Sequence, residues 1–219
     1  MKQKIKYGMI GGGIGSFIGD IHRKAAAMDD QMALVCGCFS SSAERSKKSG
    51  EMLGLPQERV YASVEELFEK EQALPAKDRM DVVSITTPNH LHFKQVKMAI
   101  KNGFHVICDK PLTVTLEQAK ELKNMADSSG LICAVTYTYT GYPMVKQARY
   151  LIENGVLGDL RKVVVEYFQG WLSTKMENSN KQAEWRTDPA RSGKAGSMAD
   201  IGSHAENLIS YITGLQITE

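Results

Sequence analysis

The chain has 219 residues, of which 42% are hydrophobic and 24% are charged, and its formal net charge is +2. These values are ordinary for a globular protein, and the mixing of basic with acidic residues argues against a nucleic-acid or membrane partner. No apolar run approaches the roughly 20 residues of a membrane span, and the basic N-terminus lacks the features of a secretory signal. We therefore expect a cytoplasmic protein.

The first half of the chain alternates short apolar runs with longer amphipathic ones. This alternation predicts β-strands joined by helical crossovers, and hence a parallel sheet covered on both faces. We interpret residues 1–135 as an α/β domain with a doubly wound sheet of the Rossmann type. The expected strands are Ile5–Ile10, Met32–Phe39, Asp81–Ile85, His105–Cys108 and Leu131–Val135, and the expected helices span about 16–28, 43–53, 64–71, 90–102 and 116–128.

After residue 135 the pattern changes. A helix is expected at Met144–Asn154, a long strand at Leu160–Trp171 and a final helix at about Ala199–Thr213, with the polar stretch Ser173–Ser197 between the last two. These elements are too few for an independent sheet domain. We therefore predict that residues 136–219 form an incomplete α+β domain. An unpaired strand edge there would aggregate or pair with a partner.

The four cysteines, Cys36, Cys38, Cys108 and Cys133, all lie in apolar, strand-like runs. None has metal-ligand spacing with histidines, so no metal site is expected. Cys36 and Cys38 are too close in an extended chain to bridge comfortably. We expect all four to be reduced residues of the core.

The first expected strand leads into the glycine-rich segment Gly11-Gly12-Gly13-Ile14-Gly15-Ser16, which opens a helix. Gly11 permits a tight turn, and Gly13 lets the backbone approach a pyrophosphate that the helix N-terminus can bind. Ser16 replaces the third glycine of the usual fingerprint. We interpret the segment as a dinucleotide-binding turn in which every residue except Gly12 contacts the cofactor; a plain flexible loop is the alternative.

The end of the second expected strand bears on the choice of dinucleotide. An NAD site usually has Asp or Glu there, whereas this chain has Ser40 and Ser41 followed by Arg45. Two hydroxyls and a guanidinium suit a 2′-phosphate, which slightly favours NADP over NAD. The alternative is that the serines only cap the next helix and that Arg45 is solvated.

Two further segments carry groups suited to alcohol oxidation. Lys110 follows the fourth expected strand, at the edge of the sheet where α/β proteins bind ligands. Asp200 and His204 are four residues apart, so they share one face of a helix, and histidine is well suited to accept a proton from a hydroxyl group. Each feature alone is more typical of a protein surface.

Together the motifs resemble the Gfo/Idh/MocA family of oxidoreductases over the whole chain. Besides the glycine turn, the resemblance rests on Thr87-Pro88-Asn89-His90-Leu91-His92, Asp109-Lys110-Pro111, Gly155-Val156-Leu157-Gly158 and Asp200 with His204. The family usually has glutamate where this chain has Asp109, whose side chain is one methylene shorter.

The resemblance implies hydride transfer between a nicotinamide and a sugar, polyol or related compound. It implies that Lys110 orients the reacting hydroxyl, that His204 is the base and that Asp200 orients substrate or base. Helix capping is the alternative role for Pro88, Asn89 and His92, which follow the third expected strand. Packing at the domain junction is the alternative role for Tyr139. The implied cofactor contacts are Thr87, Pro88, Asn89, His92, Asp109 and Lys110, and the implied substrate contacts are Lys110, Tyr139, Trp185, Arg186, Asp200 and His204.

Two other functions remain open. A minority of the family are glycosidases that recycle the bound nucleotide, and a third hypothesis is a nucleotide-binding sensor without catalysis. The family resemblance also implies a longer chain and a homo-oligomer, either a dimer or a tetramer. It implies that residues 136–219 are part of a domain for substrate binding and dimerisation.

Overall fold

The computed structural model describes residues 4–170 and 172–218, which divide into two compact units at Val135 and Thr136. The first unit contains a five-stranded sheet in the order β2-β1-β3-β4-β5. The registers of β1 with β2 and β3, and of β3 with β4, are parallel. The predicted α/β Rossmann fold is confirmed. The strands are β1 (Ile5–Gly11), β2 (Met32–Cys38), β3 (Val82–Thr86), β4 (His105–Asp109) and β5 (Cys133–Thr136).

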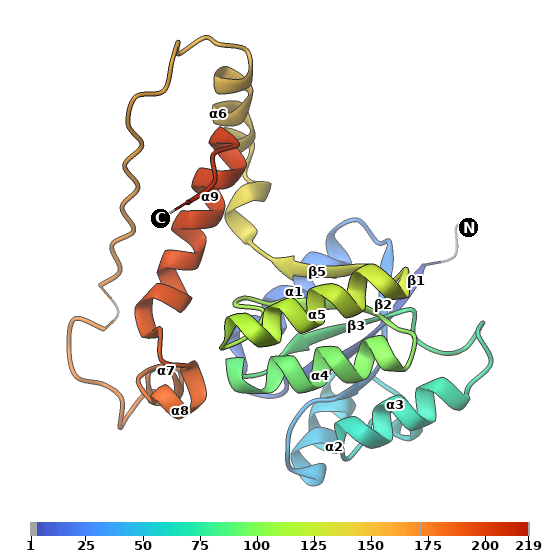
Figure 1. Ribbon diagram of the computed structural model, residues 1–219. Helices are drawn as coiled ribbons and strands as arrows, with labels where there is room; N and C mark the ends of the chain where they lie inside the picture. The colour runs from blue at the N-terminus through green and yellow to red at the C-terminus, as the bar shows by residue number, and fades with distance from the viewer. Residues whose placement is uncertain (1–3, 171, 219) are drawn as a thin grey trace. The chain divides into compact units, whose positions relative to one another are not determined.

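The crossover helices cover both faces of this sheet. Because the strand order reverses at β1 and such crossovers are right-handed, α1 covers one face while α3, α4 and α5 cover the other. Figure 1 shows α4 and α5 side by side on their face. Each face has its own apolar core, one including Tyr7 and Met9 and the other Ile10 and Ile85. The helices are α1 (Phe17–Met28), α2 (Ala43–Met52), α3 (Val64–Ala73), α4 (Asn89–Lys101) and α5 (Leu116–Ser129), with a short 3₁₀ turn at Gln57–Arg59.

The cysteines take part in this core as expected. Cys36, Cys38 and Cys108 are buried, Cys133 is half-buried, and all four are free thiols. Burial raises the pKa of Cys38 to about 11, so its thiol stays protonated at neutral pH. In the part of the chain that the structure describes, no helix is long and apolar enough to cross a bilayer.

Glu71, in α3, is a charged side chain inside the first unit, with none of its surface exposed. Its carboxylate accepts hydrogen bonds from the Arg59 guanidinium at 2.8 and 2.9 Å and from the Tyr61 hydroxyl at 2.6 Å. It also accepts one from the Met80 backbone N–H at 2.9 Å. This carboxylate therefore ties α3 to the segment before it and to Met80, just ahead of β3.

The second unit is mainly helical. The expected helices are confirmed as α6 (Pro143–Glu153) and α9 (Ser203–Thr213), and α9 is preceded by a π-helix at Met198–Gly202. A 3₁₀ turn, Thr138–Gly141, precedes α6. The polar stretch Ser173–Ser197 contains two short helices, α7 (Lys181–Arg186) and α8 (Pro189–Ser192).

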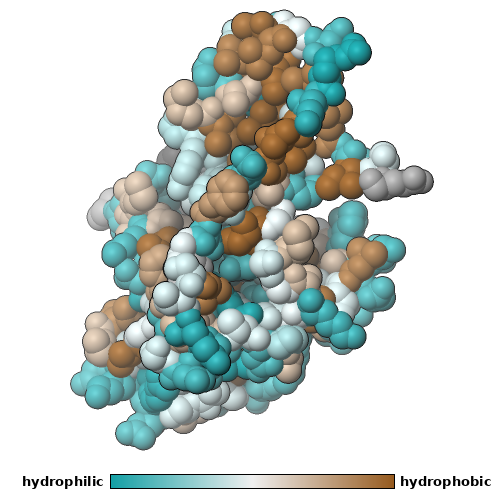
Figure 2. All heavy atoms as spheres, turned by 90° about the vertical axis from the view of Figure 1, so that its left-hand side faces the viewer, coloured by the Kyte–Doolittle hydropathy of each residue, from teal (hydrophilic) through white to brown (hydrophobic). Residues whose placement is uncertain are grey.

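The strand predicted at Leu160–Trp171 is wrong. Residues 160–170 have no regular secondary structure, and Trp171 lies outside the described residues. A strand requires a hydrogen-bonded neighbour, and no described strand of the second unit pairs with this segment. Its apolar side chains are consequently exposed, with Val164 at 66% and Phe168 at 85%. Figure 2 shows a broad apolar area on this unit.

Candidate functional site

The glycine turn lies at the carboxyl end of β1, where the strand order of the sheet reverses. Open α/β sheets bind their ligands at this switch point. Gly11, Gly12 and Gly15 have φ values of 79°, 72° and 76°, which L side chains rarely adopt. A Cβ at Gly15 would meet no described atom within 4 Å, so the outer side of the turn is open. The N-cap of α1 is Ser16, whose hydroxyl accepts from the Gly19 N–H at 3.3 Å.

The inner side of the turn is tightly packed. A Cβ at Gly19 would lie 2.2 Å from the Gly12 Cα, so Gly19 provides the close approach of helix to strand that Ser16 does not. A Cβ at Gly13 would lie 2.7 Å from both the Phe39 carbonyl oxygen and the Ser49 hydroxyl. The turn therefore requires glycine at Gly13, which the sequence pattern singled out, and also at Gly19, which it did not.

Two side chains outside the motif hold the turn in place. Ser49 in α2 accepts a hydrogen bond from the Ile14 N–H at 3.2 Å. Arg23 in α1 donates to the Gly12 carbonyl at 2.6 Å. Neither residue carries a signal in the sequence, because each lies within an ordinary amphipathic helix. The Ile14 N–H is therefore already bonded, while its side chain is 42% exposed.

The end of β2 carries the residues predicted to select the dinucleotide. Ser40 accepts from the Ser42 N–H at 3.2 Å, and Ser42 caps α2 by accepting from the Arg45 N–H at 3.4 Å. Ser41 and the Arg45 side chain are exposed. A hydroxyl that accepts one hydrogen bond can still donate another. Helix capping and phosphate binding are therefore compatible at this position.

The other predicted residues of the first unit follow β3 and β4. Gly11 is opposite Thr86, and Ile85 is opposite Cys108, so the segments after these strands lie on the same edge of the sheet as the glycine turn. Residues 87–89 and 109–110 are half-buried, apart from the buried Asn89. The Lys110 N–H is 2.9 Å from an Asp109 carboxylate oxygen. The His92 ring is fully buried beneath this edge.

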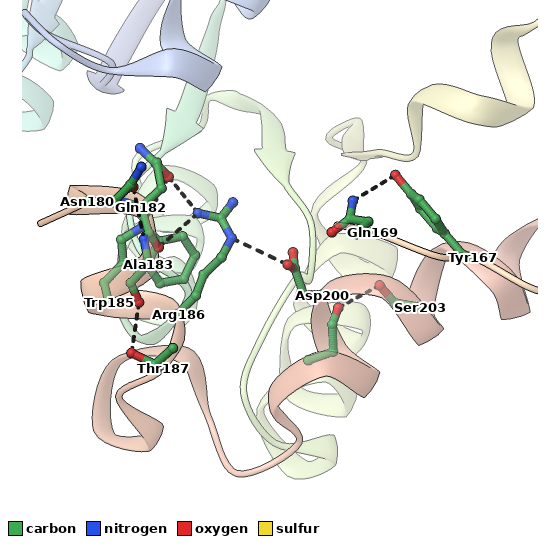
Figure 3. Close-up of polar contacts among 11 residues, drawn as sticks. Tyr167, Gln169, Asn180, Gln182, Ala183, Trp185, Arg186, Thr187, Asp200 and Ser203 are labelled. Carbon is green, nitrogen blue, oxygen red and sulfur yellow. Dashed lines mark hydrogen bonds and ion pairs between the residues drawn. The ribbon is translucent and has the colours of Figure 1, made fainter. Parts of the chain in front are cut away.

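In the second unit, an ion pair joins two of the predicted substrate residues. The Arg186 Nε is 3.4 Å from an Asp200 carboxylate oxygen, and both side chains are 26% exposed. Figure 3 shows the Arg186 guanidinium between Asp200 and the Gln182 side chain, whose amide oxygen accepts from it. The guanidinium also lies 4.3 Å from the centroid of the Trp185 ring, a cation–π contact. Asp200 is thus held by a preorganised arginine.

His204, at the start of α9, is 9% exposed and lies among aromatic rings. Ring centroids of Tyr139, Tyr137 and Tyr167 lie 4.7, 5.8 and 6.3 Å from its own, the first two edge to face, as aromatic pairs prefer. The Tyr139 and Tyr167 hydroxyls are hydrogen-bonded. That bond, with burial, raises the pKa of Tyr139 to about 12, so this hydroxyl stays protonated. Tyr167 was not predicted to lie here, because it belongs to the segment expected to form a strand.

The described residues fit a dinucleotide better than a metal. The open outer side of the glycine turn and the N–H groups that begin α1 suit a pyrophosphate. In residues 4–170 and 172–218, no group of three His, Cys, Asp or Glu side chains is arranged to hold a metal ion.

Asp200 lies within the π-helix, a conformation frequent at functional sites. Lys110 belongs to the first unit, and Asp200 and His204 belong to the second.

Comparisons with known proteins agree with this geometry. A family model described as an oxidoreductase family with an NAD-binding Rossmann fold matches residues 5–137. A second, described as the GFO/IDH/MocA C-terminal domain, matches residues 145–219. The uncharacterized oxidoreductase YfiI of Bacillus subtilis is 37% identical over 206 residues, covering 93% of this chain and 52% of that protein.

Solved structures give the same relationship. An inositol dehydrogenase homolog complexed with NAD+ from Azotobacter vinelandii matches with a TM-score of 0.94 at 37% identity, over 98% of this chain and 55% of that chain. The corresponding homolog complexed with NADH and myo-inositol has a TM-score of 0.89 at 35% identity, over 98% and 54% of the two chains. This chain thus spans about half the length of these relatives. With an NAD-binding Rossmann domain followed by part of the matching C-terminal domain, it belongs to the Gfo/Idh/MocA family of oxidoreductases.

Proposed function

We propose that this chain acts in hydride transfer between a nicotinamide dinucleotide and a hydroxyl-bearing carbon of a sugar, inositol or other polyol. The observation that carries the proposal is the ion-paired Asp200, one helical turn before the buried His204, in a chain with an NAD-binding fold. The similar A. vinelandii protein is complexed with NADH and myo-inositol, which supports a polyol substrate. The oligomeric state expected from the sequence, a dimer or tetramer, is part of the same proposal.

In this proposal each residue has a separate task. The glycine turn and the N-terminus of α1 bind the pyrophosphate, and the nicotinamide, when bound, accepts or supplies the hydride. The Lys110 ammonium binds the reacting hydroxyl oxygen and favours its ionised form. His204 accepts the hydroxyl proton, and Asp200 orients substrate or base. The protonated Tyr139 donates a hydrogen bond to the substrate.

The same proposal gives NADPH tighter binding than NADH. The end of β2 has no acidic residue to bind a ribose hydroxyl, and the exposed Arg45 can pair with a 2′-phosphate. Replacing Arg45 by alanine is expected to weaken NADPH binding by up to about fivefold, because an exposed ion pair is worth at most about 1 kcal/mol. NADH binding should not change. Fluorescence titration with each nucleotide measures both effects, with K48A, an exposed lysine on the same helix, as the matched control.

An absorbance assay tests the reaction itself. With the preferred nucleotide, we expect a sugar and polyol panel that includes myo-inositol to give a stoichiometric change in the nicotinamide band. Cleavage of a glycoside without net absorbance change would instead indicate a glycosidase that recycles its nucleotide. Nucleotide binding without turnover of any substrate, and unaffected by replacement of Lys110, would indicate a sensor. A chain that binds neither nucleotide would refute the proposal.

A further inference from the structure

The buried ring of His92 connects two loops at the nucleotide-binding edge of the first unit. Its Nδ1 is 2.8 Å from the Pro111 carbonyl oxygen, and its Nε2 is 2.7 Å from the Thr87 carbonyl oxygen. Pro111 follows β4 and Thr87 follows β3, which are neighbouring strands of the sheet. None of the ring is exposed. One side chain in α4 therefore spans the ends of two strands.

The chemistry of the ring makes this connection unusual. A carbonyl oxygen only accepts hydrogen bonds, so both ring nitrogens must carry a proton for both bonds to form. A neutral imidazole has one N–H and can make only one of them. Burial lowers the pKa of His92; the two carbonyl acceptors and the Asp109 carboxylate oppose this effect, whereas His90 adds to it. The link therefore has two bonds in the protonated ring and one in the neutral ring.

The two loops that the ring connects carry the residues assigned to cofactor and catalysis. The Thr87 hydroxyl donates to the buried Gln95 side chain at 2.6 Å, so α4 holds Thr87 through both its carbonyl and its hydroxyl. On the other side, Pro111 directly follows Lys110, whose N–H bonds to Asp109. The main chain of Lys110 is thus fixed by Asp109 before it and by His92 after it.

We propose that His92 is a positioning residue that holds the Pro111 main chain against Thr87 and thereby sets where the Lys110 amino group stands relative to the 87–89 turn. This differs from the direct cofactor contact expected from the sequence. The assignment rests on the proposed function for the roles of Lys110 and the turn. The link itself depends only on the contacts of the ring.

The position of the Lys110 amino group can be followed without enzymatic turnover. Reductive methylation with ¹³C-formaldehyde labels the lysines of the whole chain, and the Lys110 signal is the one lost in K110R. We expect this signal to shift as the pH falls below the usual histidine pKa of about 6.5, when the second bond of His92 forms. The pH-dependent shift should disappear in both H92Q and H92F. H92F keeps a planar ring of similar size but has no nitrogen that could bond to either carbonyl, and so separates positioning from core filling.

Two histidines serve as matched controls. His90 is exposed on the same helix, and His22 in α1 lies in the field of the same Asp109 carboxylate while its Nδ1 is 2.9 Å from the Ser84 hydroxyl. In H90Q and H22Q the shift of the Lys110 signal should persist. If it persists in folded H92F, or vanishes in H22Q instead, the positioning role of His92 is refuted.

NADH titration of the same samples separates this inference from the proposed function. If the unmodified chain binds no dinucleotide, the proposed function fails, yet the Lys110 signal still decides whether His92 fixes that lysine. If the chain binds NADH and the pH-dependent shift of the Lys110 signal persists in folded H92F, the proposed function stands and the positioning role fails. Circular dichroism of each variant establishes that it is folded.

Discussion

Replacing Lys110 by methionine is expected to lower the rate of hydride transfer at saturating nucleotide and substrate by about 10²–10⁴-fold, the usual contribution of a positioned acid–base group. Methionine keeps most of the side-chain length but removes the charge that binds the reacting oxygen. The loss should fall mainly on kcat, because ionisation of the hydroxyl occurs in the transition state. Initial rates in the nicotinamide absorbance assay measure the effect.

The matched control is K101M, which removes a lysine from the exposed end of α4. Its rate should remain that of the unmodified chain. A K110M variant that keeps kcat and only raises KM would show that Lys110 contributes uniform binding, not transition-state stabilisation. That result would remove the lysine from the proposed mechanism but leave the nucleotide site intact.

Replacing Glu71 by alanine is expected to destabilise the first unit by about 3–5 kcal/mol, the usual loss when one partner of a buried ion pair is removed. The deletion leaves the Arg59 guanidinium, the Tyr61 hydroxyl and the Met80 N–H without their acceptor, and the carboxylate is fully buried. Urea unfolding followed by circular dichroism should show a lower midpoint with an unchanged slope.

Glu69 provides the control for this change, because it is exposed two residues earlier on the same helix. E69A removes the same charge and is expected to alter the free energy of unfolding by no more than about 0.5 kcal/mol. If E71A lowers the free energy of unfolding by less than about 1 kcal/mol, the Glu71 network contributes little net stability. The desolvation of its ions would then cancel the attraction between them.

The nucleotide-binding half of the molecule was predictable because its signals are local. Short apolar runs that alternate with amphipathic ones specify strands and helices, and right-handed crossovers then leave few topologies. The glycine turn and Lys110 follow strands, so a parallel sheet brings them to one edge. In the structure, β1 and β4 are both paired in parallel with β3, so the glycine turn and Lys110 follow strands that end at the same edge of the sheet.

The residues that support the site were not predictable in this way. Gly19, Arg23 and Ser49 act on the glycine turn through contacts that depend on how closely two helices approach it. Nothing in their own spacing distinguishes them from other helix residues. His92 was identified from its motif, but its bonds to two carbonyls were set by the neighbouring positions of β3 and β4.

By itself, then, the sequence determined the class of fold, the position of the dinucleotide turn and the family motifs, since these depend on periodicity and on residues adjacent in the chain. Tertiary structure decided the partners: Arg186 with Asp200, the tyrosines around His204 and the buried carboxylate of Glu71. It also decided against the strand at 160–170, because an apolar alternating segment becomes a strand only where another strand accepts its hydrogen bonds. Local patterns fix what a segment can form, and its neighbours in space fix what it does form.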